Sequence, residues 1–71
     1  MIVVNAIMKT NESIFEAVKD AVKELEIKTR EEAGCIDYAF SLELYNDRII
    51  RITELWDNLQ SLKDHLKTDH V

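Results

Sequence analysis

The chain has 71 residues, which is room for one domain spanning residues 1–71, and a formal net charge of −5. Its basic residues are scattered among acidic ones, which excludes nucleic acid as the main partner, because phosphate binding needs clustered Lys and Arg. A single cysteine, no signal peptide and no apolar run of membrane-spanning length predict a cytoplasmic protein that has no disulfide and no membrane partner.

Residues 1–9 are predicted to form a strand. This segment is rich in β-branched residues and is apolar on both alternating sides, which is typical of a central strand covered on both faces. Asn5 is the polar exception, and it shares its side with Val3 and Ile7. A buried amide must be hydrogen-bonded, so we expect Asn5 to have a partner or to face a cavity.

A helix of roughly 20 residues is predicted to follow. Ser13 and Glu16 have the spacing of a capping box, which marks a helix start. Gly34, the only glycine, suits the left-handed residue that ends a helix. One stripe of the helix is apolar and consists of Ile14, Val18, Ala21, Val22 and Leu25.

Residues 35–56 are predicted to form an antiparallel hairpin, because apolar residues alternate with polar ones on both sides of a turn-forming segment at residues 46–48. With that loop, Phe40 faces Glu54 and Tyr38 faces Trp56. On the other face Glu43 meets Arg51, a favourable cross-strand pair. Glu54 is then the one carboxylate on an aromatic and aliphatic face.

A second helix is predicted after Trp56, with Asp57 as its cap and His65 beside its leucines. The order strand, helix, strand, strand, helix predicts an α+β, ferredoxin-like fold with an antiparallel sheet and both helices on one face. The fourth strand of that unit is missing. Either the sequence is a fragment, or a partner subunit covers the exposed edge.

Three motifs carry a resemblance to a known family. They are Arg30-x-Glu32-Ala33-Gly34-Cys35-x-x-Tyr38, then Glu54-x-Trp56, then Leu62-x-x-His65. Together they resemble the antibiotic biosynthesis monooxygenase family over nearly the whole chain. The family usually has proline at the position of Ala33, and it continues into a further strand after the His65 region.

The resemblance implies a fold, a partner and an activity. It implies a homodimer, a dimeric α+β barrel in which two sheets pack face to face with the helices outside. It also implies oxidation of a phenolic or quinol-like small molecule by dioxygen in a pocket between sheet and helices, with no cofactor and no metal. An anionic substrate can react with oxygen unaided if the protein supplies an apolar cavity, a hydrogen-bond donor and a proton acceptor.

The resemblance also implies roles for particular residues. Asn5 would hold an oxyanion, His65 would take or relay a proton, and Trp56 would stack on the substrate ring. Substrate contacts are assigned to Tyr38, Phe40 and Glu54. Haem degradation, known in a relative of the family, is disfavoured because His65 occupies the position of its Trp.

Each of these residues also has a structural interpretation. Glu54 fits a structural acid, and Trp56 and Tyr38 fit core aromatics. His65 fits a surface pair with Asp69, and its spacing of five from His70 does not suit two ligands of one zinc ion.

The second hypothesis for function is therefore a non-catalytic dimeric module that binds a small ligand or serves a structural role on the same fold. An open cavity lined by Asn5, Trp56 and His65 would favour the enzyme. An interior filled by Phe15, Phe40 and leucines would favour the module.

Overall fold

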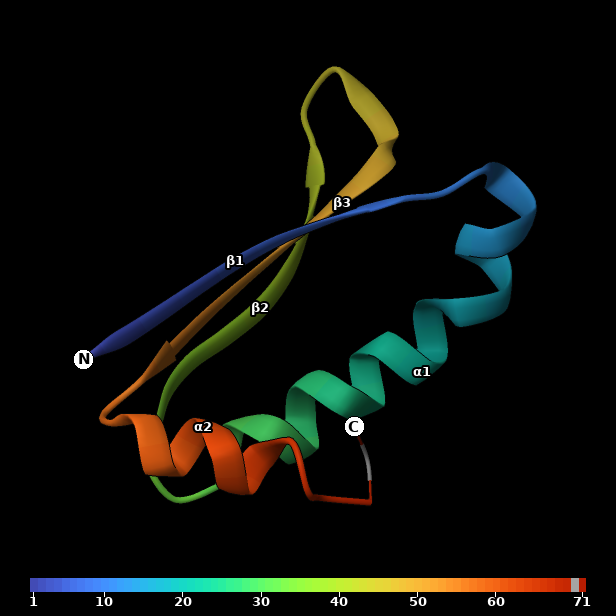
Figure 1. The fold of residues 1–71 in the computed structure, drawn as a ribbon. Coiled ribbons are helices and arrows are strands. Elements are labelled where there is room, and N and C mark those ends of the chain that lie inside the picture. The colour runs from blue at the N-terminus through green and yellow to red at the C-terminus, as the bar shows by residue number, and fades with distance from the viewer. Residues whose placement is uncertain (70) are drawn as a thin grey trace.

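The computed structural model describes residues 1–69 and 71, so His70 and its predicted spacing lie outside the described residues. Five elements follow one another along the chain: β1 (Ile2–Lys9), α1 (Glu12–Arg30), β2 (Cys35–Glu43), β3 (Asn46–Trp56) and α2 (Leu59–His65). Figure 1 shows the three strands as one twisted layer and both helices on the same side of it. The predicted order of elements and the α+β, ferredoxin-like class are confirmed.

The sheet is antiparallel, with strand order β1-β3-β2. The central strand is β3, so the prediction that residues 1–9 form a central strand is wrong for the single chain. β1 is apolar on both sides although it lies at an edge of the sheet. Val3 is 56% exposed and Ile7 58% exposed on the side that faces away from the helices.

The hairpin is confirmed, but its turn lies two residues earlier than predicted. Leu44 and Tyr45 form the turn, and Phe40 pairs with Ile52 where the prediction paired it with Glu54. A shift of two residues leaves the side chains from Asp37 to Leu42 on their predicted faces, because side chains alternate with a period of two. The pairing of β2 with β3 is irregular on either side of this segment, between Cys35 and Asp37 and between Leu42 and Glu43. The ion pair between Arg51 and Glu43 forms, at 2.7 Å, although the two residues are no longer directly opposite.

Both helices cover one face of the sheet. α1 packs mainly on β2, and α2 packs on the end of β3. Residues that pair across antiparallel strands share a face, so the register assigns the strand side chains to this helix-covered face. They are Ile2, Val4, Ala6, Met8, Tyr38, Phe40, Leu42, Ile50, Ile52, Glu54 and Trp56.

Two contacts tie α1 to the outer edge of β2. The Glu26 carboxylate accepts a hydrogen bond from the backbone N–H of Phe40 at 2.6 Å. The Arg30 Nε donates one to the carbonyl oxygen of Tyr38 at 2.8 Å. Side chains of the helix thus satisfy backbone groups that an edge strand would otherwise leave open to another strand.

The helix ends differ from the prediction in detail. Asn11 caps α1, and its side chain accepts a hydrogen bond from the Ile14 N–H at 2.9 Å, so Ser13 is not the cap. Asn58, and not Asp57, caps α2. Gly34 does have a left-handed backbone, with φ of 83°, but α1 has ended earlier, at Arg30, and Gly34 leads into β2. Asx side chains satisfy the free N–H groups of a first turn, which explains both caps.

Within the described residues, neither helix has the length and apolar character that crossing a membrane requires.

Candidate functional site

The helix-covered face has two ends with different packing. One end, which we call the packed end, consists of Tyr38, Trp56 and His65 together with the carboxylates of Glu32 and Glu54. Trp56 is 0% exposed, His65 3% and Tyr38 5%. The His65 ring lies 4.8 Å from the Trp56 ring and 5.5 Å from the Tyr38 ring, centroid to centroid. Rings at these separations make favourable aromatic contacts.

Two ring nitrogens at the packed end, one of His65 and one of Trp56, are each held by a carboxylate. The Nδ1 of His65 lies 2.8 Å from Glu32 Oε2, and Trp56 Nε1 donates to Glu54 Oε1 at 3.0 Å. A carboxylate on Nδ1 fixes the ring orientation of a histidine, as in many proton-transfer sites. The sequence analysis assigned no site role to Glu32. The available signal was the Glu32-Ala33-Gly34-Cys35 motif.

Tyr38 keeps its proton in this surrounding. Burial is the main cause, and together with the nearby Glu54 and Glu32 carboxylates it raises the pKa of Tyr38 to about 12. The phenol is neutral at any physiological pH, so it is available as a hydrogen-bond donor and not as a base.

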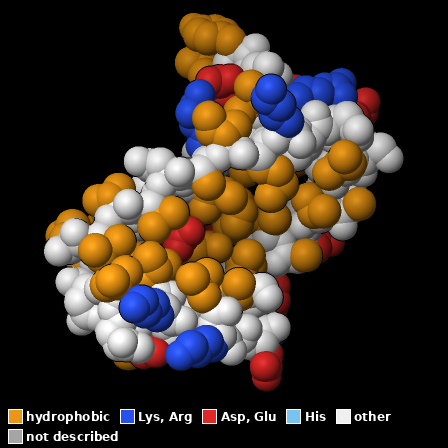
Figure 2. All heavy atoms as spheres, in the orientation of Figure 1, with side chains coloured by type: hydrophobic (Ala, Val, Ile, Leu, Met, Phe, Trp, Pro, Cys, Tyr) orange, Lys and Arg blue, Asp and Glu red, His pale blue; other side chains and the backbone are white. Residues whose placement is uncertain are grey.

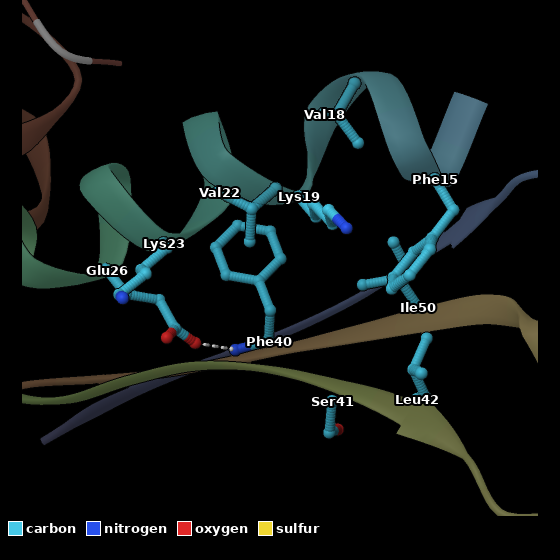
Figure 3. Close-up of a pocket in the computed structure, with 10 residues that line it drawn as sticks. All are labelled: Phe15, Val18, Lys19, Val22, Lys23, Glu26, Phe40, Ser41, Leu42 and Ile50. Atoms are coloured by element: carbon cyan, nitrogen blue, oxygen red, sulfur yellow. Dashed lines mark hydrogen bonds between the residues drawn. The ribbon is translucent and has the colours of Figure 1, made fainter. Parts of the chain in front are cut away.

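The other end of the face is an apolar groove between α1 and strands β2 and β3, with a volume of about 210 Å³. We call it the open groove. Figure 2 shows hydrophobic side chains gathered in the hollow between the strands and α1, with an acidic side chain among them. Figure 3 shows the residues that line the open groove: Phe15, Val18, Lys19, Val22, Lys23, Glu26, Phe40, Ser41, Leu42 and Ile50.

The open groove carries its own polar groups. Glu26 is its carboxylate, and Lys19 and Lys23 line the same helix wall. The predicted apolar stripe of α1 included Val18 and Val22 but missed Phe15, because the stripe was started one residue too early, at Ile14. Ile14 is 45% exposed.

Phe40 connects the two regions. It lines the open groove, and its ring makes an edge-to-face contact with Tyr38 at a centroid distance of 5.6 Å. Of the six predicted site residues, Phe40 alone lines the groove. Tyr38, Trp56, His65 and Glu54 lie behind it in the packed end.

Asn5 lies on the opposite face of the sheet. It pairs with Thr53, which in turn pairs with Ala39, and this row points away from the helices. Asn5 is exposed there and lines a surface depression with Arg51. The predicted cavity shared by Asn5, Trp56 and His65 therefore does not exist within one chain. The register of β1 on β3, which the sequence analysis did not assign, decides this.

Metal binding and the reactivity of the cysteine also bear on the chemistry of the site. Among residues 1–69 and 71, no cluster of three or more His, Cys, Asp or Glu side chains is arranged to hold a metal ion. Burial raises the pKa of the half-buried Cys35 thiol, and the Glu32 and Asp37 carboxylates add to the shift, so the thiol stays protonated and weakly nucleophilic.

The sequence and the fold match a known family of proteins. The family model of the antibiotic biosynthesis monooxygenases matches residues 1–71, and the chain belongs to that family. No curated protein matches the chain.

Several solved structures share the fold. A conserved protein from Methanosarcina mazei is 32% identical, with a TM-score of 0.91, and the match covers 96% of this chain and 67% of that one. A Bacteroides thetaiotaomicron protein of unknown function, suggested to be an oxidoreductase, is 32% identical, with a TM-score of 0.89 and coverage of 96% and 72%. A candidate antibiotic biosynthesis monooxygenase from Deinococcus radiodurans is 26% identical, with a TM-score of 0.90 and coverage of 97% and 68%.

Proposed function

We propose that this protein is a monooxygenase that binds a quinol-like or phenolic small molecule in the open groove and oxidises it with dioxygen, without a metal or an organic cofactor. The observation that carries this proposal is the groove itself. It is an apolar hollow of about 210 Å³ with one carboxylate in its lining, in a chain of the monooxygenase family. Apolar pockets with a few polar groups are the usual form of a small-molecule site.

The reaction balances without a further reductant. The quinol loses a hydroxyl proton and gives electrons to dioxygen, and a hydroperoxide forms on a ring carbon. Loss of water leaves a hydroxyquinone, so that one oxygen atom enters the ring and the other leaves as water. All four electrons come from the substrate.

Glu26 is the group best located to take the hydroxyl proton. It lines the open groove, and its Oε2 already accepts the Phe40 N–H at 2.6 Å, which fixes the carboxylate in place. The second oxygen and the remaining lone pairs can accept a hydrogen bond from a substrate hydroxyl. Phe40 offers its ring as a surface for an aromatic substrate.

The other predicted residues take supporting roles in this proposal. Tyr38, Trp56, His65 and Glu54 form the buried wall behind Phe40. His65 and Trp56 are buried and do not line the groove, so we assign them no contact with the substrate. Asn5 faces away and would act at a site only together with a partner chain.

We further propose a homodimer that works in the cytoplasm. The face of the sheet that points away from the helices exposes Val3 and Ile7, at 56% and 58%. A second sheet packed on this face would cover both side chains and Asn5. The helix-covered face, with the open groove, would remain accessible.

Oxygen uptake with a panel of hydroquinones tests the activity. We expect equal amounts of oxygen and quinol to be consumed, one labelled atom from ¹⁸O₂ in the product, and no hydrogen peroxide, which uncatalysed autoxidation would release. Glu26→Gln keeps the hydrogen bond to Phe40 but removes the proton acceptor, and should lower kcat by at least about tenfold. Glu24→Gln is the matched control on the exposed side of α1. Peroxide in place of ring hydroxylation would refute the proposal.

A second candidate function is a non-catalytic module that binds a small ligand. The burial of Trp56 and His65, at 0% and 3% exposed, favours it, because these predicted catalytic side chains do not line the groove. Binding of quinols without oxygen uptake, abolished by the groove-filling change Val18→Trp, would establish this function instead.

A further inference from the structure

We infer that the molecule bound in the open groove is a single-ring aromatic that carries an anionic substituent, held by Lys19 and Lys23. This inference rests on the proposed function and specifies its substrate class. Three features carry it: the size of the groove, its apolar floor and the two cations on its helix wall.

The two lysines stand one helical turn apart on the same wall. They are at positions i and i+4 of α1, and both line the open groove. Like charges at this spacing repel one another, so an isolated helix gains nothing from them. An anion placed between them would turn that repulsion into two favourable contacts.

The ammonium group of Lys23 in particular is available to a ligand. Among the described residues it takes part in no ion pair, whereas Lys19 is paired with Glu16 at 2.9 Å. The carboxylate of Glu26 lines the groove as well. Its charge is offset by the Phe40 N–H at 2.6 Å and by the Arg30 guanidinium at 3.9 Å. The balance on the helix wall therefore favours an anionic ligand group near the lysines.

The floor of the groove selects an aromatic ring. Phe15, Val22 and Phe40 project into it, together with Ile50, which is 4% exposed (Figure 3). A dry cavity of about 150 Å³ holds benzene in another protein. A groove of about 210 Å³ thus accommodates one ring with short substituents. A fused multi-ring compound or a haem would extend far beyond it.

Together these features describe a ring lying on Phe40 with a hydroxyl at Glu26 and an acidic group at the lysines. A neutral quinol of the same shape would occupy the floor but leave both cations solvated. The acid should therefore bind better than a neutral analogue, and the preference should weaken as salt screens the charges.

The test compares gentisate, a hydroquinone with one carboxylate, with gentisamide, its neutral amide. Binding to the full chain is measured by calorimetry without oxygen, so that turnover does not enter. We expect gentisate to bind about fivefold more tightly at low salt. Lys23→Met should abolish this preference, and Lys19→Met should reduce it. Lys28→Met, on the same helix but outside the groove, is the control of equal charge and should leave the preference intact.

The outcomes separate the inference from the proposed function. If both compounds bind equally and Lys23→Met changes nothing, the anionic class is wrong while a quinol site in the groove stands. If Val18→Trp, which fills the groove, does not weaken the binding of either compound, the groove is not the site and both proposals fail. A preference that persists in Lys23→Met and in Lys19→Met also overturns the assignment to these lysines.

Discussion

The packed end and the open groove lie on the same face of the same sheet, yet one is closed and the other is hollow. At the packed end Trp56 is 0% exposed, whereas Leu42 in the groove is 46% exposed. The difference comes from what covers each end. α2 lies over the end of β3, while α1 packs mainly on β2 and leaves a groove open beside Leu42. The covered end can supply stability, and the uncovered end can supply a binding site.

The two outer edges of the sheet differ in the same way. Glu26 and Arg30 hydrogen-bond the outer backbone of β2, at Phe40 and Tyr38. The described residues provide no such cover for β1, whose pairing is with β3 alone. α1 is thereby fixed against the β2 edge of the sheet, and the groove stays open toward the β1 edge.

Truncation of a core residue at the packed end should have the largest effect on the free energy of unfolding. Trp56→Ala removes a fully buried ring and should lower the free energy of unfolding by about 3–5 kcal/mol. Leu42→Ala, in the groove, should cost about 1 kcal/mol or less, because that side chain is already half in solvent. Urea denaturation followed by circular dichroism measures both. Equal losses would mean that the two ends do not differ in packing.

A substitution at Gly34 should lift α2 from the packed end. The Gly34 carbonyl accepts a hydrogen bond from the Asp57 N–H at 2.9 Å, and a Cβ on Gly34 would collide with the Ser61 and Asp57 side chains. Its φ of 83° is also unfavourable for any other residue. Gly34→Ala should therefore cost about 2 kcal/mol in the free energy of unfolding.

The control for this change is Ser61→Ala. It removes the hydroxyl that donates to Asp57 at 2.7 Å but introduces no clash. A loss of less than about 1 kcal/mol is expected for it in the same urea titration. If both variants lose the same stability, the hydrogen bond matters and the close approach of Gly34 does not.

The sequence was sufficient for the strand side chains of the packed end, because they belong to a strong local pattern. Alternation along residues 35–56 predicted the shared face of Tyr38, Phe40 and Trp56, and it survived a two-residue error in the turn. The turn itself was misassigned because Asn46 and Asp47 favour turns by composition, whereas the observed turn uses Leu44 and Tyr45, which have no such signature.

The location of Asn5 and the polar side chains of the groove could not be predicted in the same way. The face of Asn5 depends on how β1 pairs with β3, a contact between segments about 50 residues apart that no local pattern specifies. The Glu26 carboxylate is held in place by its hydrogen bond to the backbone of Phe40, and the Glu32 carboxylate by its contact with the His65 ring. Such partners become visible only once the elements are packed.

The buried phenol of Tyr38 should make the packed end sensitive to alkali. Its folded pKa is raised to about 12 from an ordinary value of 10.0, so folding favours the protonated form. The stabilisation is complete below pH 10 and is lost as pH rises from about 10 to 12, by on the order of 2 kcal/mol.

Urea titrations across this pH range compare the protein with Tyr38→Phe. The variant lacks the ionising group, so its stability should fall less steeply above pH 10. Tyr45→Phe, at a side chain that is 95% exposed, is the control and should follow the unchanged protein. If the free energy of unfolding of Tyr38→Phe falls with pH as steeply as that of the unchanged protein, ionisation of Tyr38 does not destabilise the folded state.

The smallest effect concerns the Cys35 thiol, which reports on whether the packed end opens. Cys35 begins β2 directly after Gly34, and burial together with nearby carboxylates raises its pKa. Since the thiolate is the reactive form, modification by a disulfide reagent near neutral pH should be several-fold slower than for a cysteine in the urea-unfolded chain. Gly34→Ala, which lifts α2, should speed the reaction, and Leu42→Ala should leave it unchanged. An equal rate of thiol modification in all three folded proteins would mean that α2 does not shield Cys35 from the reagent. The packed end and the groove would then differ in shape but not in how well they exclude a reagent.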